Sequence, residues 1–240
     1  MNSVLQGHFT SVMGVTSREG LLAEVVAFTK HLGFVTVDAM VVVDHVPGES
    51  EFILVNNAPP GFRDVAHCAE DGLRDPVMQH CKRASVPIVW NQDTYTSARQ
   101  GDLWEVQARF GYCTGITVAS HLPRGLHFCI GVDRDRPLPR TPVEVTRMVA
   151  DLQLFAAHAQ DAALRVLLPP KPQEDSPDLT RRELESLRWT MEGKTAWELG
   201  RILGISEQTA VRHVNNAARK LDCVNKHHAV VKALRLGLIR

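Results

Sequence analysis

Residues 195–221 read TAWELGRILGISEQTAVRHVNNAARKL, and this stretch decides how the end of the chain folds. Thr195 is of the type that caps helix N-termini, and the segment Ala196–Leu203 follows it with apolar residues at helical spacing. Gly204 permits a tight turn, after which Ser206 can cap a second helix. Two short helices joined by a glycine-containing turn predict a helix-turn-helix.

The flanking residues extend this prediction to an all-α unit of four helices. Thr180 and Glu183 have the spacing of a capping box, so a helix is expected to begin near Arg181 and to end at Gly193. A fourth helix is expected over residues 226–236.

The second helix of a helix-turn-helix lies in the major groove, where its side chains reach base edges. Residues 175–240 carry 12 Lys and Arg against 8 Asp and Glu, a balance of +4, whereas residues 1–174 carry 15 against 19, a balance of −4. A basic end favours contact with a polyanion. A solvated helix on an ordinary bundle is the alternative. The candidate DNA-binding residues are Thr195, Ser206, Gln208, Thr209, Arg212, His213 and Asn216.

This part of the chain closely resembles the DNA-binding domain of LuxR-type regulators. The matching segments are Leu179-Thr-Arg-Arg-Glu-Leu-Glu185, Gly193-Lys-Thr195, Glu198-Leu-Gly200, Ile205-Ser-Glu-Gln-Thr209, Lys220-Leu221, Asn225-Lys-His-His-Ala229 and Gly237-Leu-Ile239. Response regulators of the NarL type also use such a domain. Their receiver domain needs an acidic pair that closes a first strand, and Asp38 and Asp44 stand alone here.

A proline-rich segment marks the boundary between the two halves. Residues 168–178 contain four prolines, which forbid a continuous helix and favour an extended spacer. We therefore expect a first domain over residues 1–168, a linker over 169–176 and a DNA-binding domain over 177–240. Residues 142–168 before the spacer have the apolar spacing of one long helix.

The first domain mixes helical and strand patterns. Helices are expected over residues 17–32, over 66–84 with an interruption at Asp75-Pro76, and over 95–110. Strands are expected over residues 34–46, 51–57, 86–90, 115–120 and 126–132, the last two as a hairpin. The predicted fold class is α+β, an N-terminal α-β-α sandwich followed by the all-α helix-turn-helix domain.

Residues 17–165 also resemble the acyl-homoserine-lactone-binding domain of LuxR-type quorum-sensing regulators. The segments that keep its spacing are Asn57-Ala-Pro-Pro-Gly-Phe62, Asp75-Pro76-Val77, Pro87-Ile-Val-Trp90, Leu103-Trp104 and Phe110-Gly111 with Gly115. The resemblance implies a sheet sandwiched by helices with a closed cavity for a small signal molecule. It also implies that Asp75 accepts the ligand's amide N–H and that Trp90 and Trp104 supply ring surface. Without the resemblance, Asp75 could simply cap a helix and Trp90 could be plain core.

Three positions depart from the family's pattern. Ala58 and Ala66 stand where the family usually has tyrosines, and Phe62 stands where it usually has a tryptophan, so customary hydrogen-bond donors are missing. Strand alternation places His127 beside Cys129 on one face, where His127 could supply a replacement donor. A pocket that has drifted from the usual lactones, or a regulator that acts without ligand, is therefore the alternative to a lactone receptor.

Other classes of protein fit the sequence less well. No stretch approaches the ~20 apolar residues of a membrane span, and the first residues do not form a secretory signal, so a cytoplasmic protein is expected. The pairs His67-Cys68 and His80-Cys81 lack the usual spacing of zinc ligands, and no metal or other cofactor is expected. The chain contains no nucleophile elbow or phosphate loop, so an enzyme is not expected.

These observations together predict a two-domain transcription regulator. Its expected partners are a small diffusible signal, an acyl-homoserine lactone or an analogue, and a double-stranded DNA operator. The resemblance also implies a homodimer, formed partly through the helix of residues 142–168, and contact with RNA polymerase.

Overall fold

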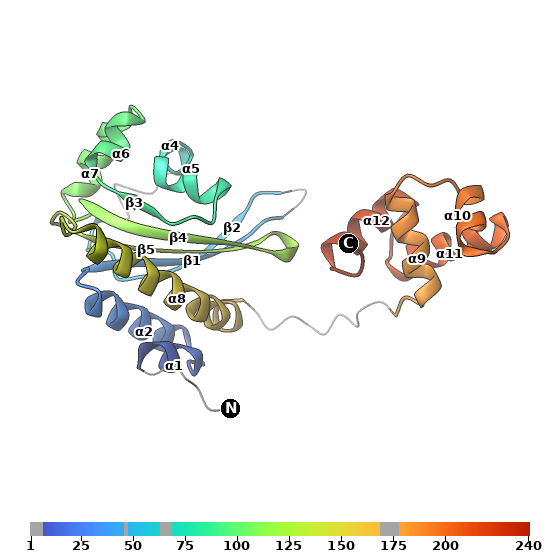
Figure 1. The fold of residues 1–240 in the computed structure, drawn as a ribbon, viewed down its shortest axis with the longest axis horizontal. Helices are drawn as coiled ribbons and strands as arrows, with labels where there is room; N and C mark the ends of the chain where they lie inside the picture. Colours follow the sequence, from blue (N-terminus) through green and yellow to red (C-terminus); the bar gives the residue numbers. More distant parts are fainter. Residues whose placement is uncertain (1–6, 46–47, 63–68, 169–177) are drawn as a thin grey trace. The chain divides into compact units, whose positions relative to one another are not determined.

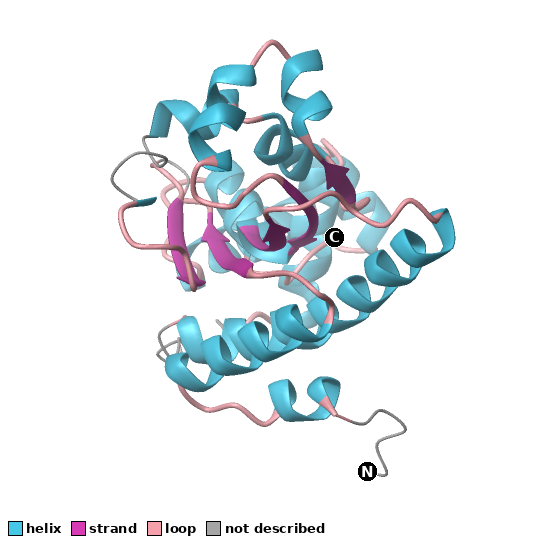
Figure 2. Cartoon of the chain, turned by 90° about the vertical axis from the view of Figure 1, so that its left-hand side faces the viewer, coloured by secondary structure: helices cyan, strands magenta, loops and turns pink. Residues whose placement is uncertain are grey.

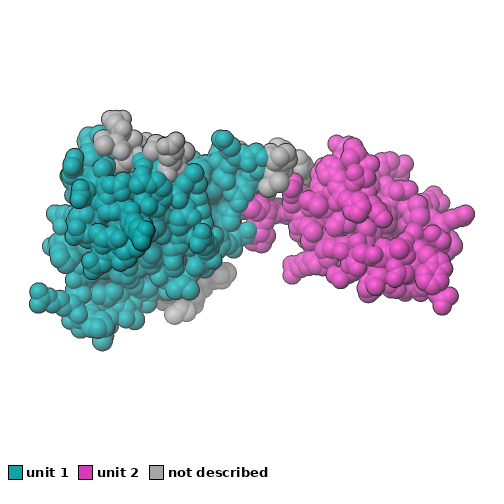
Figure 3. All heavy atoms as spheres, turned by 90° about the horizontal axis from the view of Figure 1, so that it is seen from above, with its two compact units in different colours: residues 1–122, 126–170 teal, residues 123–125, 171–240 magenta. Residues whose placement is uncertain are grey.

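The computed structural model describes residues 7–45, 48–62, 69–168 and 178–240. The chain divides into two compact units, residues 1–122 with 126–170 and residues 123–125 with 171–240 (Figure 3). The first unit combines helices with a sheet, and the second is helical. The predicted α+β fold class is therefore confirmed.

An antiparallel sheet forms the centre of the first unit, with the strand order β2-β1-β5-β4-β3 (Figure 1). The strands are β1 Thr36–Val43, β2 Glu51–Asn56, β3 Ile88–Trp90, β4 Thr114–Leu122 and β5 Leu126–Arg134. The predicted hairpin is β4 with β5, joined through the short 3-10 helix η1, Pro123–Gly125. Each strand runs where β-branched and apolar residues were expected, because such side chains pack well on a pleated surface.

Helices cover both faces of this sheet, as the predicted sandwich requires (Figures 1 and 2). One face is covered by α1 His8–Met13, α2 Arg18–His31 and α8 Pro142–Leu167. The other face is covered by α4 Ala69–Arg74, α5 Pro76–Arg83, α6 Gln92–Ser97 and α7 Gly101–Ala108. None of the helices that the structure describes combines the length and the apolar character needed to cross a membrane.

Two helical segments of the first unit are each divided into two helices. The single helix expected over residues 95–110 is two helices, because Arg99 adopts a left-handed conformation with φ 58° that ends α6. The interruption expected at Asp75-Pro76 within residues 66–84 is present, because Asp75 caps α5. The first three residues of that expected helix lie outside the described part of the chain.

Strand alternation separates the two faces of β5. Phe128, Ile130 and Val132 join the core beneath α2 and α8, where the rings of Phe28 and Phe155 stack with centroids 3.8 Å apart. Burying an apolar side chain of this size stabilises the fold by about 1.5–3 kcal/mol. The intervening residues of β5 face the opposite side of the sheet, so the same strand contributes to both layers.

The second unit has four helices, α9 Arg181–Met191, α10 Ala196–Leu203, α11 Glu207–Lys220 and α12 Lys226–Arg235. Thr180 with Glu183 and Thr195 with Glu198 form capping boxes at the starts of α9 and α10. Gly200 allows the turn after α10 to approach closely, since a Cβ there would lie 2.8 Å from the carbonyl oxygen of Ile205. The helix-turn-helix expected from the sequence is therefore present.

Candidate functional site

A second hydrophobic cluster lies on the sheet face that α4–α7 cover. Its buried members are Phe62, Val77, Cys81, Trp90, Tyr95, Tyr112, Ala119 and Cys129. It thus brings together three of the predicted ligand-binding residues, Phe62, Trp90 and Cys129, and Trp104 packs against them. Residues far apart in the sequence meet here because the antiparallel register places them on one face.

The family resemblance implies a closed cavity on this face of the sheet. The side chains of the cluster that lines this face are packed against one another. Two surface hollows of about 410 and 430 Å³ lie elsewhere, at Trp189 and beside Pro76, and no member of the cluster lines them.

Asp75 occupies a position with two structural contacts. Its Oδ1 accepts hydrogen bonds from the backbone N–H groups of Val77 at 2.8 Å and Met78 at 3.0 Å, which caps α5. Its Oδ2 accepts the hydroxyl hydrogen of Tyr95 at 3.0 Å. The capping alternative is thus what the structure shows.

Both predicted tryptophans have engaged indole N–H groups. Trp90 is buried, its Nε1 donates to the Thr117 hydroxyl at 3.3 Å, and its ring meets Tyr95 edge-on. The Nε1 of Trp104 donates to the carbonyl oxygen of Cys113 at 3.0 Å. Each tryptophan can therefore offer ring surface to a ligand without offering a free N–H.

Glycine at position 115 makes room for Trp90. A Cβ on Gly115 would lie 2.7 Å from two carbons of the Trp90 ring and would also collide with the carboxylate of Asp133. The family resemblance included Gly115 only as a spacing marker, and the structure supplies its physical reason.

Asp133 is a buried carboxyl on the same face that the sequence analysis did not single out. It lies opposite Gly115 in the β4–β5 register, and Gly115 pairs with Trp90. Burial raises the pKa of Asp133 well above its usual range, and the nearby carboxylates of Asp38 and Asp75 add to the effect. Extending the alternation His127, Cys129, residue 131 by one more step would have identified it.

His127 does not join this group, which corrects the expectation that it shares the pocket. It lies six residues along β5 from Asp133, about 20 Å at the rise of a strand. Its Nε2 contacts Asp44 Oδ2 at 2.8 Å and its Nδ1 contacts Nδ1 of His121 at 2.9 Å, so both ring nitrogens have partners at the hairpin end. Cys129 is in the cluster, and the neighbouring Cys81 thiol and burial raise its pKa well above normal, so it remains a neutral thiol. The predicted residue Ala66 lies outside the described residues.

The helix α11 presents an exposed stripe. Ala210, Val214 and Ala217 are buried in the unit, whereas the opposite side carries Gln208 and Arg212 in exposed positions. His213, Thr209 and Asn216 are half-buried, and Asn216 accepts a hydrogen bond from Arg219 at 3.3 Å. Two further exposed residues of this stripe, Val211 and Asn215, were not among the predicted residues, although the spacing i, i+3, i+4, i+7 from residue 208 identifies them.

Two of the predicted DNA-binding residues are helix caps. The Thr195 hydroxyl accepts the N–H of Glu198 at 3.3 Å, and the Ser206 hydroxyl accepts the N–H of Thr209 at 3.1 Å. Both caps are exposed, at the N-termini of the two helices of the helix-turn-helix. A helix N-terminus favours an anion such as a phosphate, so capping and backbone contact are compatible there.

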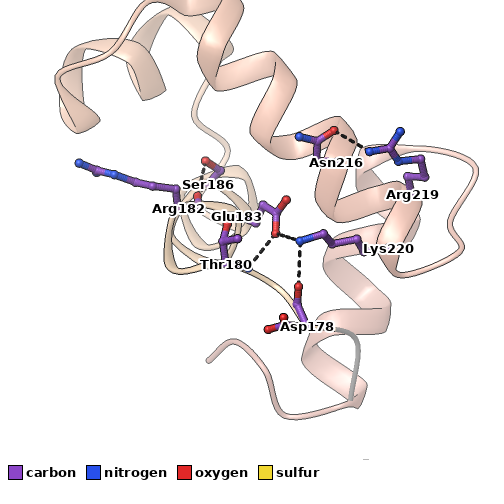
Figure 4. A network of polar contacts seen from close by, with 8 residues as sticks. All are labelled: Asp178, Thr180, Arg182, Glu183, Ser186, Asn216, Arg219 and Lys220. Carbon is purple, nitrogen blue, oxygen red and sulfur yellow. Dashed lines mark hydrogen bonds and ion pairs between the residues drawn. The ribbon is translucent and has the colours of Figure 1, made fainter. Parts of the chain in front are cut away.

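A charged network fixes α9 against α11. The Nζ of Lys220 donates to Glu183 Oε2 at 2.9 Å and to the carbonyl oxygen of Asp178 at 2.8 Å (Figure 4). The Glu183 carboxylate also accepts the backbone N–H of Thr180 at 2.7 Å. Burial acts to raise the pKa of Glu183, but these hydrogen bonds and the ammonium charge outweigh it, and the pKa lies below its usual value.

Comparison with known proteins gives consistent results for both units. Residues 17–163 match the family described as autoinducer binding domain, and residues 177–233 match the luxR family of bacterial regulatory proteins. The HTH-type quorum sensing-dependent transcriptional regulator RpaR of Rhodopseudomonas palustris is 36% identical over 196 residues, which cover 80% of this chain and 77% of RpaR. The transcriptional activator SolR of Ralstonia nicotianae is 38% identical over 165 residues, 69% of each chain. The solved structure of SdiA in complex with octanoyl-rac-glycerol matches with a TM-score of 0.69 and 25% identity, covering 97% of this chain and 93% of SdiA.

Proposed function

Because the chain belongs to the LuxR family of quorum-sensing transcription regulators with an autoinducer-binding domain, we propose that its signal is an acyl-homoserine lactone or a related acylated small molecule. The family consists of DNA-binding regulators and not of enzymes. The proposed signal-binding domain comprises residues 1–168, joined by a linker of residues 169–176 to the DNA-binding domain of residues 177–240.

One observation carries the proposal for the signal site. Tyr95 belongs to the buried aromatic cluster with Phe62 and Trp90, and its hydroxyl donates to Oδ2 of Asp75 at the start of α5. Ring surface together with a partly buried carboxylate suits a ligand that has an apolar chain and an amide N–H. Trp104 and Cys129 extend this surface.

A non-lactone acyl compound is the second candidate signal. Ala58 and Phe62 provide no hydrogen-bonding side-chain groups, so the usual donors to a lactone are absent at these positions. SdiA, which matches over most of the chain, is described with octanoyl-rac-glycerol bound. An acylglycerol therefore belongs among the compounds tested.

Thermal unfolding of the purified protein tests the signal proposal. The series contains acyl-homoserine lactones of graded chain length and octanoylglycerol. A ligand at a hundred times its dissociation constant stabilises its receptor by about 2.7 kcal/mol, which raises the melting temperature by roughly 5–10 °C for a domain of this size. An optimum in chain length would support the proposal. A flat response from protein shown by mass spectrometry to be ligand-free would refute it.

The proposed DNA interface is the exposed stripe of α11, with the caps Thr195 and Ser206 beside the phosphate backbone. Gln208, Thr209, Arg212, His213 and Asn216 would face the major groove, and Val211 could contact a thymine methyl group. A symmetric homodimer, formed partly through α8, would bind two half-sites about one helical turn, ~34 Å, apart. Regulation would take place in the cytoplasm, in contact with RNA polymerase.

Arg212→Ala tests this interface because no ion pair engages Arg212 in the described part of the chain. Loss of one base or phosphate contact weakens operator binding by about 1–3 kcal/mol. The matched control, Arg181→Ala, removes the same charge from the start of α9 and should weaken binding less. Equal effects of the two substitutions would contradict the assignment of α11 as the reading helix.

A further inference from the structure

Two buried polar groups of the first unit have no hydrogen-bond partner among the described residues, the hydroxyl of Tyr112 and the side-chain N–H₂ group of Gln107. Tyr112 as a whole is only 3% exposed. The backbones of the two residues are joined at the end of α7, where the N–H of Tyr112 donates to the carbonyl oxygen of Gln107 at 3.2 Å. Buried polar groups are normally paired, so these two exceptions require a physical explanation.

Tyr112 belongs to the same aromatic cluster as the candidate signal site. Its ring stacks on Phe62, with centroids 4.2 Å apart and planes 12° from parallel. Phe62 in turn meets Phe110 edge-on at 5.4 Å. The unpaired phenol of Tyr112 therefore lies against Phe62, a side chain that has no hydrogen-bond donor.

The other tyrosine of the chain provides a direct contrast. Tyr95 is buried to the same degree, 2% against 3% exposed, but its hydroxyl donates to Asp75 Oδ2 at 3.0 Å. The cluster thus holds one paired phenol and one unpaired phenol, and Gln107 at the end of α7 carries an unpaired amide N–H₂ group. Both unpaired groups can donate a hydrogen bond, so an oxygen acceptor is a ligand group that would satisfy both.

We propose that Tyr112 and Gln107 are ligand-binding residues that donate hydrogen bonds to a carbonyl oxygen of the acylated signal. This inference rests on the proposed function of the first domain. A carbonyl oxygen has two lone pairs and can accept from a phenol and an amide together. Tyr112 would thereby supply the hydrogen bond that Phe62 cannot give, from the ring stacked upon it.

The protonation state of Tyr112 agrees with this role. Burial raises the pKa of Tyr112, and the carboxylates of Asp38 and Asp133 add to the increase. The phenol therefore stays protonated throughout the physiological range and remains a donor.

The first part of the test uses ligand-free protein and compares Tyr112→Phe with Tyr95→Phe. Tyr95→Phe removes a paired hydroxyl and should lower the melting temperature. Tyr112→Phe removes a hydroxyl that has no partner, so the melting temperature should stay equal or rise. A fall for Tyr112→Phe as large as that for Tyr95→Phe would show that the Tyr112 hydroxyl is structurally paired and would overturn the proposal.

The second part measures dissociation constants for three probes. These are N-octanoyl homoserine lactone, its 3-oxo derivative and N-cyclopentyloctanamide, which has the amide carbonyl but lacks the lactone oxygens. Tyr112→Phe should weaken binding of every probe whose carbonyl oxygen accepts the Tyr112 hydrogen bond. The expected loss of affinity is roughly 5- to 100-fold, the loss expected for one buried hydrogen bond. Gln107→Leu should weaken binding of the same probes as Tyr112→Phe does.

The pattern of losses identifies which oxygen is bound. A loss confined to the two lactones assigns the lactone carbonyl, a loss for all three assigns the amide carbonyl, and a loss confined to the 3-oxo compound assigns the chain carbonyl. Unchanged affinities for all three probes, with wild-type protein binding them, would overturn the role of Tyr112 while leaving the proposed function intact. If the wild-type protein bound none of them, the lactone proposal itself would fall, and the ligand class inferred for Tyr112 with it.

Discussion

Replacing Asp75 separates its structural role from its proposed role in signal binding. In Asp75→Ala, α5 loses its cap, which costs about 1 kcal/mol. The Tyr95 hydroxyl, which donates to Asp75 Oδ2 at 3.0 Å, also loses its acceptor. Leaving a buried hydroxyl unpaired costs about 1–3 kcal/mol. The sum of about 2–4 kcal/mol corresponds to a fall in melting temperature of roughly 4–16 °C for a domain of this size.

Asp75→Asn should behave differently. Asparagine caps helices nearly as well as aspartate, so the N–H groups of Val77 and Met78 keep their acceptor. The Tyr95 hydroxyl can rotate and accept from the new amide, so the free energy of unfolding should fall by less than about 1 kcal/mol. The carboxylate that would accept the ligand's N–H is gone, and the ligand-induced rise in melting temperature should be lost.

The assay is thermal unfolding of wild type, both Asp75 variants, Tyr95→Phe and the double variant Asp75→Ala with Tyr95→Phe, each with and without ligand. Removing the orphaned hydroxyl should recover part of the loss, so the two substitutions should couple by about 1 kcal/mol or more. Equal melting temperatures for Asp75→Ala and Asp75→Asn, or strictly additive effects in the double variant, would refute the reasoning.

Three further predictions concern other parts of the two units. Gly115→Ala should destabilise the first unit by about 1–3 kcal/mol in chemical denaturation, because its methyl group would collide with Trp90; a stabilising effect would contradict the close approach. Because the pKa of Glu183 is lowered in the folded state, its pair with Lys220 adds stability above the unfolded-state pKa of about 4.3 and loses it as the pH falls through the lower folded value. Denaturant titrations of wild type and Glu183→Gln should therefore differ by about 1–3 kcal/mol near neutral pH and converge as the pH falls through the lowered folded-state pKa of Glu183; a difference that is independent of pH would count against the ionised pair. His127→Ala should leave the ligand-induced rise in melting temperature unchanged, since its ring bonds to Asp44 at the hairpin end, whereas loss of that rise would return His127 to the signal site.

Local sequence patterns were sufficient to predict where the helices of the second unit begin. Thr180 with Glu183, and Thr195 by itself, place two helix starts, and the structure has capping boxes at both. Interactions within a helix turn and between adjacent short helices involve residues three to fifteen positions apart, so spacing alone carries most of the information. The same kind of signal placed α2 and α8 in the first unit.

Expectations about the first unit were incomplete where the backbone departs from a regular pattern. The apolar spacing of residues 95–110 continues across Arg99, whose left-handed conformation divides α6 from α7. Such a conformation is rare for arginine, and nothing in the local composition announces it. The break matters because it sets the direction of α7, at whose end Gln107 and Tyr112 come together.

The sequence by itself determined the two-domain organisation, the α+β class, the helix-turn-helix and the family resemblance, because each depends on short-range spacing or on residue order along the chain. Only the tertiary structure decided which side chains meet on the sheet. The strand register separates His127 from Trp90. Ring stacking places Tyr112 on Phe62. At the start of α5, Asp75 accepts a hydrogen bond from Tyr95. These contacts join residues 20 to 50 positions apart, and whether a buried hydroxyl finds a partner depends on distances of a few tenths of an ångström that no local pattern encodes.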